Sequence, residues 1–330
     1  MEIKDLAGIG DPLKRLFEII AEGVGEVSRP YFTKKNAEAT AYQTQVMSQA
    51  IAESSKLLVS ADYEYVDGKI KILASSDQAS KIPELNERAA KRNEYQELRK
   101  QQNIESVCAN AAEELAGASQ VPENKPEPEW IDHFFDIAEK ISTEDLQYLW
   151  GKILAGEIKK PGSFSLRTLE VLKNMSRQEA ENFDKLGQYV LGNEDSTFFL
   201  DPNEYIFKKD NGLNFSEILA LKESGLVNYY DVLGFHIDAS SAGTTEKLLY
   251  GSLVLLLERE KDIPQISIAV GGLTKAGTEL LKLITIQPDM DYLKFVAQKF
   301  NREGMKIAYA SILREEEGLF HIEDKTYFSF

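Results

Sequence analysis

The alternation of apolar and polar positions predicts that the chain begins with an amphipathic helix. Asp11 can cap this helix, and Pro12 suits its first position because a proline there gives up no useful N–H. At 100° per residue the apolar side chains fall within one arc of about 100°; they are Leu13, Leu16, Phe17, Ile20, Val24 and Val27. An apolar face this wide must be buried against something. The opposite face has three Glu against two basic residues, and this charge favours a protein surface over a lipid surface as the partner of the apolar face. We therefore expect an association surface, with a membrane surface as the less favoured alternative; its residues are Leu13, Leu16, Phe17, Ile20 and Val24.

Two more helices and a β-hairpin are predicted before residue 118. Apolar spacing predicts a helix over about 36–58, and mixed-sign i, i+4 pairs predict a long one over about 83–116. Between them the period changes to two, and Asp67-Gly68 marks the turn of a hairpin over 63–72. The long helix has few apolar residues of its own, and such a helix usually leans on another. We expect the two helices to form an antiparallel hairpin that a second copy of the chain completes.

A linker and a compact helical domain are predicted next. Residues 119–129 contain three prolines and four charged residues, which leaves almost nothing to bury. Helix signals follow at Trp130, at a Ser142/Asp145 capping box, at Ser163 and at a Ser176/Glu179 capping box. Trp150 recurs at helical spacing with Leu146, Ile153 and Leu154, so we expect it in the core.

The remainder of the chain mixes strand and helix patterns. Strands are predicted near 197–200, 205–208, 226–230, 248–257, 265–270, 305–313 and 319–328, and helices after Asn214 or Ser216, after Thr274 and from Met290. The expected fold is mainly α with a C-terminal α/β part: a long helical hairpin, a compact helical domain and a winged-helix-like mixed domain. The expected boundaries are 1–118, 119–129, 130–192 and 193–330.

Composition narrows the choice of partners and location. The 330 residues include 38 Lys and Arg against 54 Asp and Glu, a net charge of −16, which disfavours phosphate-rich nucleic acid although a local basic face is still allowed. A single cysteine excludes a disulfide framework or a thiolate zinc site and fits a reducing cytosol. No apolar run approaches the roughly 20 residues that span a bilayer, and the N-terminus lacks a signal-peptide pattern. We expect a cytoplasmic protein.

The residues that could carry chemistry do not form a motif. His133, His236 and His321 lie far apart in sequence, and Cys108 has no histidine nearby to activate it. The glycines of 271–277 lack the order of a phosphate-binding loop. The Glu run at 315–317 is typical of a solvated turn. We therefore predict no catalytic residue, no cofactor and no metal.

Two stretches resemble known families. Residues 213–284, with a helix ending in KESGLV and a later GGLTKAGTELLKLI, resemble the closing half of a winged helix, but the helix FSEILALKESG is net acidic and offers little to a DNA groove. LQYLWGKILAGEIKKPGSFSLRTLEVLKNMS (146–176), with RAAKRNEYQELRKQQNIESV (88–107), resembles an uncharacterised bacterial domain-of-unknown-function family from Pro12 to about Tyr189. That resemblance implies a bacterial source and the same order of parts, and no reaction.

Three functions compete at this point. The leading hypothesis is a non-enzymatic, self-associating scaffold, sensor or adaptor that binds a protein partner as a homo-oligomer, as an accessory in stress or anti-phage defence. The alternatives are a metal-dependent hydrolase or nuclease and a DNA-binding regulator. Metal-dependent activity would identify the second, and salt-dependent DNA binding the third.

Overall fold

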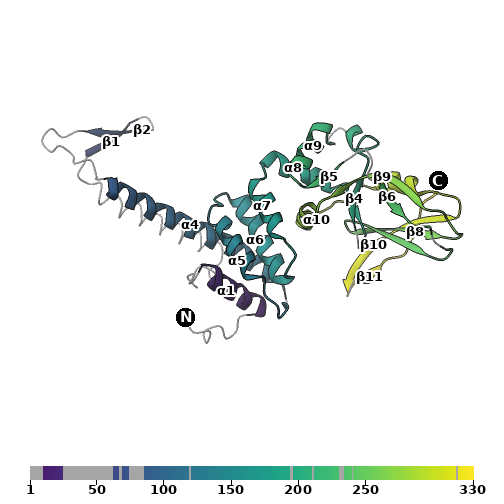
Figure 1. Ribbon diagram of the computed structural model, residues 1–330, viewed down its shortest axis with the longest axis horizontal. Helices are drawn as coiled ribbons and strands as arrows, with labels where there is room; N and C mark the ends of the chain where they lie inside the picture. Colours follow the sequence, from purple (N-terminus) through teal and green to yellow (C-terminus); the bar gives the residue numbers. More distant parts are fainter. Residues whose placement is uncertain are drawn as a thin grey trace. The chain divides into compact units, whose positions relative to one another are not determined.

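The computed structural model divides the chain into two compact units, Met1–Lys160 and Pro161–Phe330 (Figure 1). It describes residues 10–24, 62–66, 69–73, 85–118, 120–193, 196–209, 212–229, 234–239, 241–316 and 319–330, with the backbone alone at 62–66, 69–73, 315–316 and 319. The helix predicted over 36–58 lies outside the described residues. The predicted boundaries at 118, 129 and 192 stay predictions.

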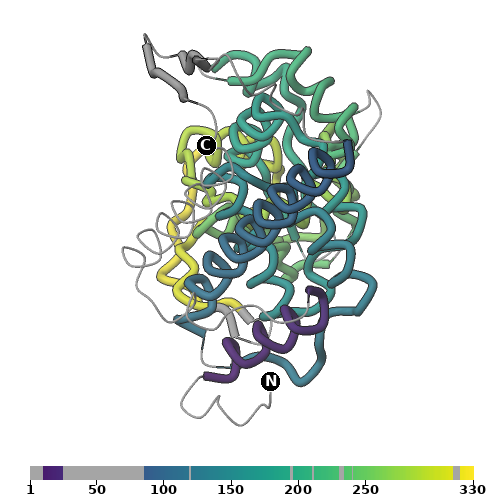
Figure 2. The backbone as a smooth tube through the Cα atoms, turned by 90° about the vertical axis from the view of Figure 1, so that its left-hand side faces the viewer, coloured from purple at the N-terminus to yellow at the C-terminus, as the bar shows by residue number. Residues whose placement is uncertain are grey.

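The first unit contains helices α1 (Asp11–Val24), α4 (Leu85–Leu115), α5 (Pro128–Ala138) and α6 (Glu144–Lys159). Strands β1 (Asp62–Val66) and β2 (Lys69–Leu73) pair antiparallel with Tyr65 opposite Ile70, which is the predicted hairpin. Helix α1 packs against α4, α5 and α6 (Figure 2). Arg15 of α1 also donates to the carbonyl oxygen of Glu123, at 3.1 Å, so the Pro-rich stretch is tied to the helix.

The core of the first unit lies where α6 runs along the C-terminal half of α4. Trp150 of α6 is buried, as predicted, and its ring centroid lies 5.4 Å from that of Phe134 in α5. The two helices approach closely because Gly151 faces the backbone of α4 at Asn110 and Ala111. A buried Asn103 side chain donates to the carbonyl oxygen of Glu139, at 2.8 Å, and fixes the end of α5 to α4.

The turn before α6 differs from the prediction. The Ser142/Asp145 capping box is wrong, because α6 begins one residue later, after Thr143, whose side chain makes no capping hydrogen bond. The Gln147 side chain, from the first turns of α6, instead donates to the carbonyl oxygen of Ile141 at 2.9 Å and so gives this carbonyl a hydrogen-bond partner.

The second unit contains α7 (Leu166–Asn174), α8 (Arg177–Gly187), the 3₁₀ turn η2 (Ile206–Lys208), α9 (Phe215–Glu223), α10 (Lys275–Leu281) and α11 (Met290–Phe300). The capping box at Ser176/Glu179 is confirmed, as are caps at Asn214 and Thr274. The strand predicted at 205–208 is wrong, since this segment forms η2.

Helix α7 is capped from outside. Its N-cap is Ser165 rather than the predicted Ser163, and the Ser165 hydroxyl does not cap its own helix. The buried carboxylate of Glu279, from α10, accepts instead from the Ser165 N–H (2.6 Å), the Ser165 hydroxyl (3.1 Å) and the Thr168 hydroxyl (2.5 Å). An anion at a helix N-terminus is stabilised by the helix dipole and by these donors.

Ten strands of the second unit form one antiparallel sheet in the order β11-β10-β8-β7-β3-β4-β9-β5, with β12 paired to β10 and β6 to β9. The strands are β3 (Leu191–Gly192), β4 (Thr197–Leu200), β5 (Val227–Asn228), β6 (Gly234–Ile237), β7 (Thr245–Tyr250), β8 (Leu253–Arg259), β9 (Ile266–Leu273), β10 (Met305–Glu316), β11 (Leu319–Ile322) and β12 (Thr326–Tyr327). Helix α11 buries its apolar side against this sheet, with Tyr292, Val296 and Phe300 in the main core.

The prediction of a mainly α chain with a winged-helix-like end is therefore wrong, and the chain is mixed α and β. The strands between 226 and 273 do not form a small wing. Strand β9 pairs with β4, which precedes that segment, and β8 pairs with β10, which follows it. These long-range pairs build a large sheet that a local motif cannot reveal.

Candidate functional site

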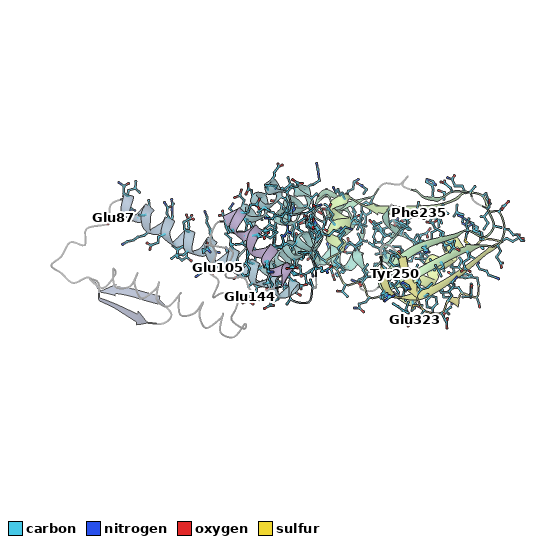
Figure 3. The ribbon with its side chains drawn as sticks, turned by 90° about the horizontal axis from the view of Figure 1, so that it is seen from below. Glu87, Glu105, Glu144, Phe235, Tyr250 and Glu323 are labelled. Atoms are coloured by element: carbon cyan, nitrogen blue, oxygen red, sulfur yellow. The ribbon has the colours of Figure 1, made fainter. Side chains whose placement is uncertain are left out.

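The N-terminal half of α4 stands apart from the packed core. From Leu85 to Arg99 every side chain is exposed except that of Ala89, which is half-buried. In the other half Ile104, Val107 and Ala111 are fully covered. Figure 3 shows Glu87 at the outer end of α4 and Glu105 where the helix reaches the bundle. About 22 Å of helix, at 1.5 Å per residue, is therefore available for contact.

One side of this exposed half is basic. Placed at 100° per residue, five side chains fall within an arc of about 100° that contains no carboxylate; they are Arg88, Lys91, Arg92, Tyr95 and Arg99. We call this set the basic face. It lies roughly opposite the buried side of the same helix. Among the described residues its four cations form no ion pair, whereas Lys100 just beyond it pairs with Glu97 at 3.0 Å and Glu139 at 3.7 Å.

Helix α5 carries the opposite charge. Glu129, Asp132 and Asp136 are exposed and fall within an arc of about 60°. We call them the acidic stripe. The helix itself contains no Lys or Arg, and Lys140 beyond its end pairs with Glu139 at 3.2 Å. This stripe was not predicted, although the i, i+3, i+7 spacing of its carboxylates is visible in the sequence.

The predicted association surface on α1 is largely occupied by the chain itself. Leu16 and Ile20 are fully buried under neighbouring helices. Leu13, Phe17 and Val24 are half-buried. The structure thus brings all five onto one helix and gives two of them a core role; association through the other three stays a prediction.

A group of interacting ionisable side chains lies in the second unit, around the start of α11. Asp289 caps that helix through the N–H groups of Asp291 (2.8 Å) and Tyr292 (3.2 Å). Its carboxylate also lies 3.4 Å from the Lys209 ammonium and accepts from the Tyr205 hydroxyl at 3.4 Å. The Lys209 ammonium sits 4.7 Å from the centre of the Tyr205 ring.

Two buried tyrosines anchor the same region. The Tyr250 hydroxyl donates to the carbonyl oxygen of Gln188 (2.8 Å) and accepts from the Asp289 N–H (3.0 Å). The Tyr292 hydroxyl donates to the carbonyl oxygen of Tyr189 at 2.8 Å. The rings of Tyr189 and Tyr205 each lie 5.1 Å from that of Tyr292. The group holds together segments that are between 39 and 103 residues apart in sequence.

The electrostatics of this group favour a structural clamp. Burial raises the pKa of Asp289, but the two N–H groups and Lys209 outweigh it and hold the pKa below its usual value. The hydrogen bond to Tyr205 raises the pKa of Lys209 well above its ordinary range. Burial raises the pKa of Tyr250 to about 12 and that of Tyr292 still further. A lysine held protonated and phenols held neutral are poorly suited to act as nucleophile or base.

These shifts predict a loss of stability in alkali. A phenol in the unfolded chain has a pKa near 10, so between about pH 10 and pH 12 the unfolded chain loses protons that folded Tyr250 keeps. The contribution is fully present below pH ~10 and disappears as the pH rises through the folded pKa. Urea unfolding at a series of alkaline pH values measures it. Tyr250→Phe should flatten the decline, and an unchanged decline in this variant would contradict the assignment.

The other candidate chemical residues are placed singly. His133 lies in α5, His236 in β6 and His321 in β11. Within the described ranges, no three His, Cys, Asp or Glu side chains are grouped closely enough to hold a metal ion. Cys108 is buried in α4, and burial raises the pKa of its thiol. No helix among the described residues is long and apolar enough to span a membrane.

The glycine-rich segment 271–277 has a packing role. Thr274 caps α10 by accepting from the Gly277 N–H at 3.1 Å, which confirms the predicted strand, turn and cap. A Cβ at Gly277 would lie 2.1 Å from the carbonyl oxygen of Leu226, so only glycine fits against the backbone just before β5.

Comparison with known proteins places the chain in a family. No curated protein and no solved structure matches it. The model of one family, DUF2806, described as a protein of unknown function, matches residues 87–297. This range covers well over half of the chain and includes both the basic face of α4 and the start of α11. The chain belongs to the DUF2806 family.

Proposed function

We propose that this protein is a non-enzymatic, self-associating scaffold or adaptor. The observation that supports the proposal is the exposed N-terminal half of α4, a helical segment with almost no packing of its own. Isolated helices of about 15 residues are marginal in water. A partner would add packing that this segment lacks, and the exposed Leu85, Tyr95 and Leu98 offer apolar area for that contact.

The resemblance described above supports a bacterial, cytoplasmic setting as part of this proposal. A single, buried cysteine suits a reducing compartment. A role as an accessory in stress or anti-phage defence belongs to the same proposal. Its test compares the survival of cells with and without the gene after phage infection or stress.

The solution mass tests the proposal directly. Light scattering coupled to size-exclusion chromatography, at micromolar protein and low salt, should give a mass of at least twice 37.1 kDa. A single species near 37.1 kDa at every protein concentration would contradict self-association. The mass is read on the full chain, so the result does not depend on either unit folding alone.

A further inference from the structure

We propose that the basic face of α4 in one copy of the chain binds the acidic stripe of α5 in a second copy. This inference rests on the proposed self-association and names the two surfaces that carry it. Charge is segregated within the first unit. Residues 85–100 contain five Lys and Arg against three Asp and Glu, whereas residues 101–160 contain five against twelve. A basic helix segment therefore projects from an acidic bundle.

The spacing of the two surfaces matches. On α4, Arg92, Tyr95 and Arg99 follow the pattern i, i+3, i+7. The acidic stripe repeats this pattern at positions 129, 132 and 136. Each set spans about 10.5 Å along its helix axis. Two helices laid side by side can thus place an arginine against a carboxylate at both ends and the Tyr95 hydroxyl against Asp132 in the middle.

Geometry within one chain keeps the two surfaces apart. The end of α5 is fixed to α4 at Asn103, beyond the C-terminal end of the basic face, by the 2.8 Å hydrogen bond to Glu139. Of the matched residues, Arg99 lies about 6 Å and Arg92 about 16 Å further along the helix. The basic face also lies roughly opposite the side of α4 that the bundle covers. A second copy carries the same acidic stripe free of that constraint.

Exposure and composition favour a protein surface as the occupant. A second copy brings the three exposed carboxylates of the acidic stripe to the cations of the basic face and also covers the exposed Tyr95 and Leu98. Each copy offers both surfaces, so the contact can form twice in a two-fold dimer. Exposed ion pairs are weak singly, so several must act together, and the contact should weaken as salt rises.

Charge reversal on each surface tests the pairing. One variant carries Arg88→Glu, Arg92→Glu and Arg99→Glu, and a second carries Glu129→Lys, Asp132→Lys and Asp136→Lys. A control with Arg177→Glu, Lys261→Glu and Arg302→Glu makes the same change in net charge as the first variant, at exposed positions of the second unit. All six sites on α4 and α5 are exposed, so circular dichroism and melting should stay near wild type.

We expect each of the first two variants to raise the dimer dissociation constant by about tenfold or more, and the control to leave it within about threefold. Mixing the two variants should restore association, because the new α4 glutamates of one variant then attract the new α5 lysines of the other. If wild type associates but neither variant changes the dissociation constant, or mixing restores nothing, this pairing is wrong and self-association still stands. A wild type that is monomeric at all concentrations overturns both proposals.

Binding of wild type and of the α4 variant to a mixed-sequence duplex DNA tests whether the basic face binds nucleic acid instead. If wild type binds it at ~150 mM salt and the α4 variant alone loses that binding with an unchanged mass, the basic face serves nucleic acid and the inference is overturned. If one variant fails to fold, the other still tests the same contact from the opposite side.

Discussion

Replacing Trp150 by alanine is expected to lower the free energy of unfolding of the first unit by about 3–5 kcal/mol. The side chain is 1% exposed and belongs to an aromatic group with Phe134 and Trp130, whose ring centroids lie 5.0 Å apart. Its removal leaves a cavity beside Phe134 of α5, and the neighbouring helices cannot move in to fill it because α4 and α6 already approach closely at Gly151. Urea unfolding followed by circular dichroism measures the change.

Tyr148, two residues earlier on α6, provides the matched control. It is 44% exposed, and its hydroxyl donates to the Glu114 carboxylate at 3.1 Å on the surface. Tyr148→Ala should therefore cost about 1 kcal/mol or less. A Trp150→Ala protein that unfolds at the same urea concentration as wild type would contradict a core role for Trp150.

Local signals in the sequence predicted the helices well. Helix α4 is expected over 83–116 and found at Leu85–Leu115, the capping box predicted at Ser176 is present, and Asn214, one of the two predicted starts, caps α9. These features depend on residues three or four positions apart, so a single segment contains all the information. The hairpin of β1 and β2 is local in the same sense.

The sheet and the cap of α7 depend on residues that are far apart in the chain. Phe198 of β4 pairs with Gly272 of β9, and Leu256 of β8 with Ala308 of β10. Glu279 reaches Ser165 across more than 100 residues of sequence. Nothing in a local pattern distinguishes a carboxylate that caps another helix from a solvated one. The segment around 213–284 resembled a winged helix because its local order of helix, strands and helix fits several sheets equally well.

The candidate surfaces could be predicted in part. The charges of α4 were visible as mixed i, i+4 pairs, a pattern typical of a solvated face. The structure adds that the bundle covers the side of the helix roughly opposite the four cations, and that Glu97 pairs with Lys100. On α1 the sequence predicted correctly that the wide apolar face needs burial. The structure adds that the chain's own helices bury Leu16 and Ile20 of this face.

Gly151→Ala should destabilise the first unit by about 1–3 kcal/mol. An added Cβ would lie 2.5 Å from the Cβ of Asn110 and 3.0 Å from the backbone nitrogen of Ala111, so α4 and α6 must separate. Helix propensity acts in the other direction, because alanine is favoured over glycine inside a helix by about 1 kcal/mol. The clash outweighs it because the atoms that must move belong to a helix backbone and not to the end of a flexible side chain.

Gly117 provides the control for this substitution. A Cβ there meets nothing within 4 Å, so Gly117→Ala should leave the urea midpoint unchanged or slightly raised. Since the C-terminal half of α4 is held by its contact with α6, Gly151→Ala should also loosen that half and accelerate amide hydrogen exchange between 103 and 111. A Gly151→Ala protein as stable as wild type, with unchanged exchange in that segment, would show that the two helices do not need this close approach.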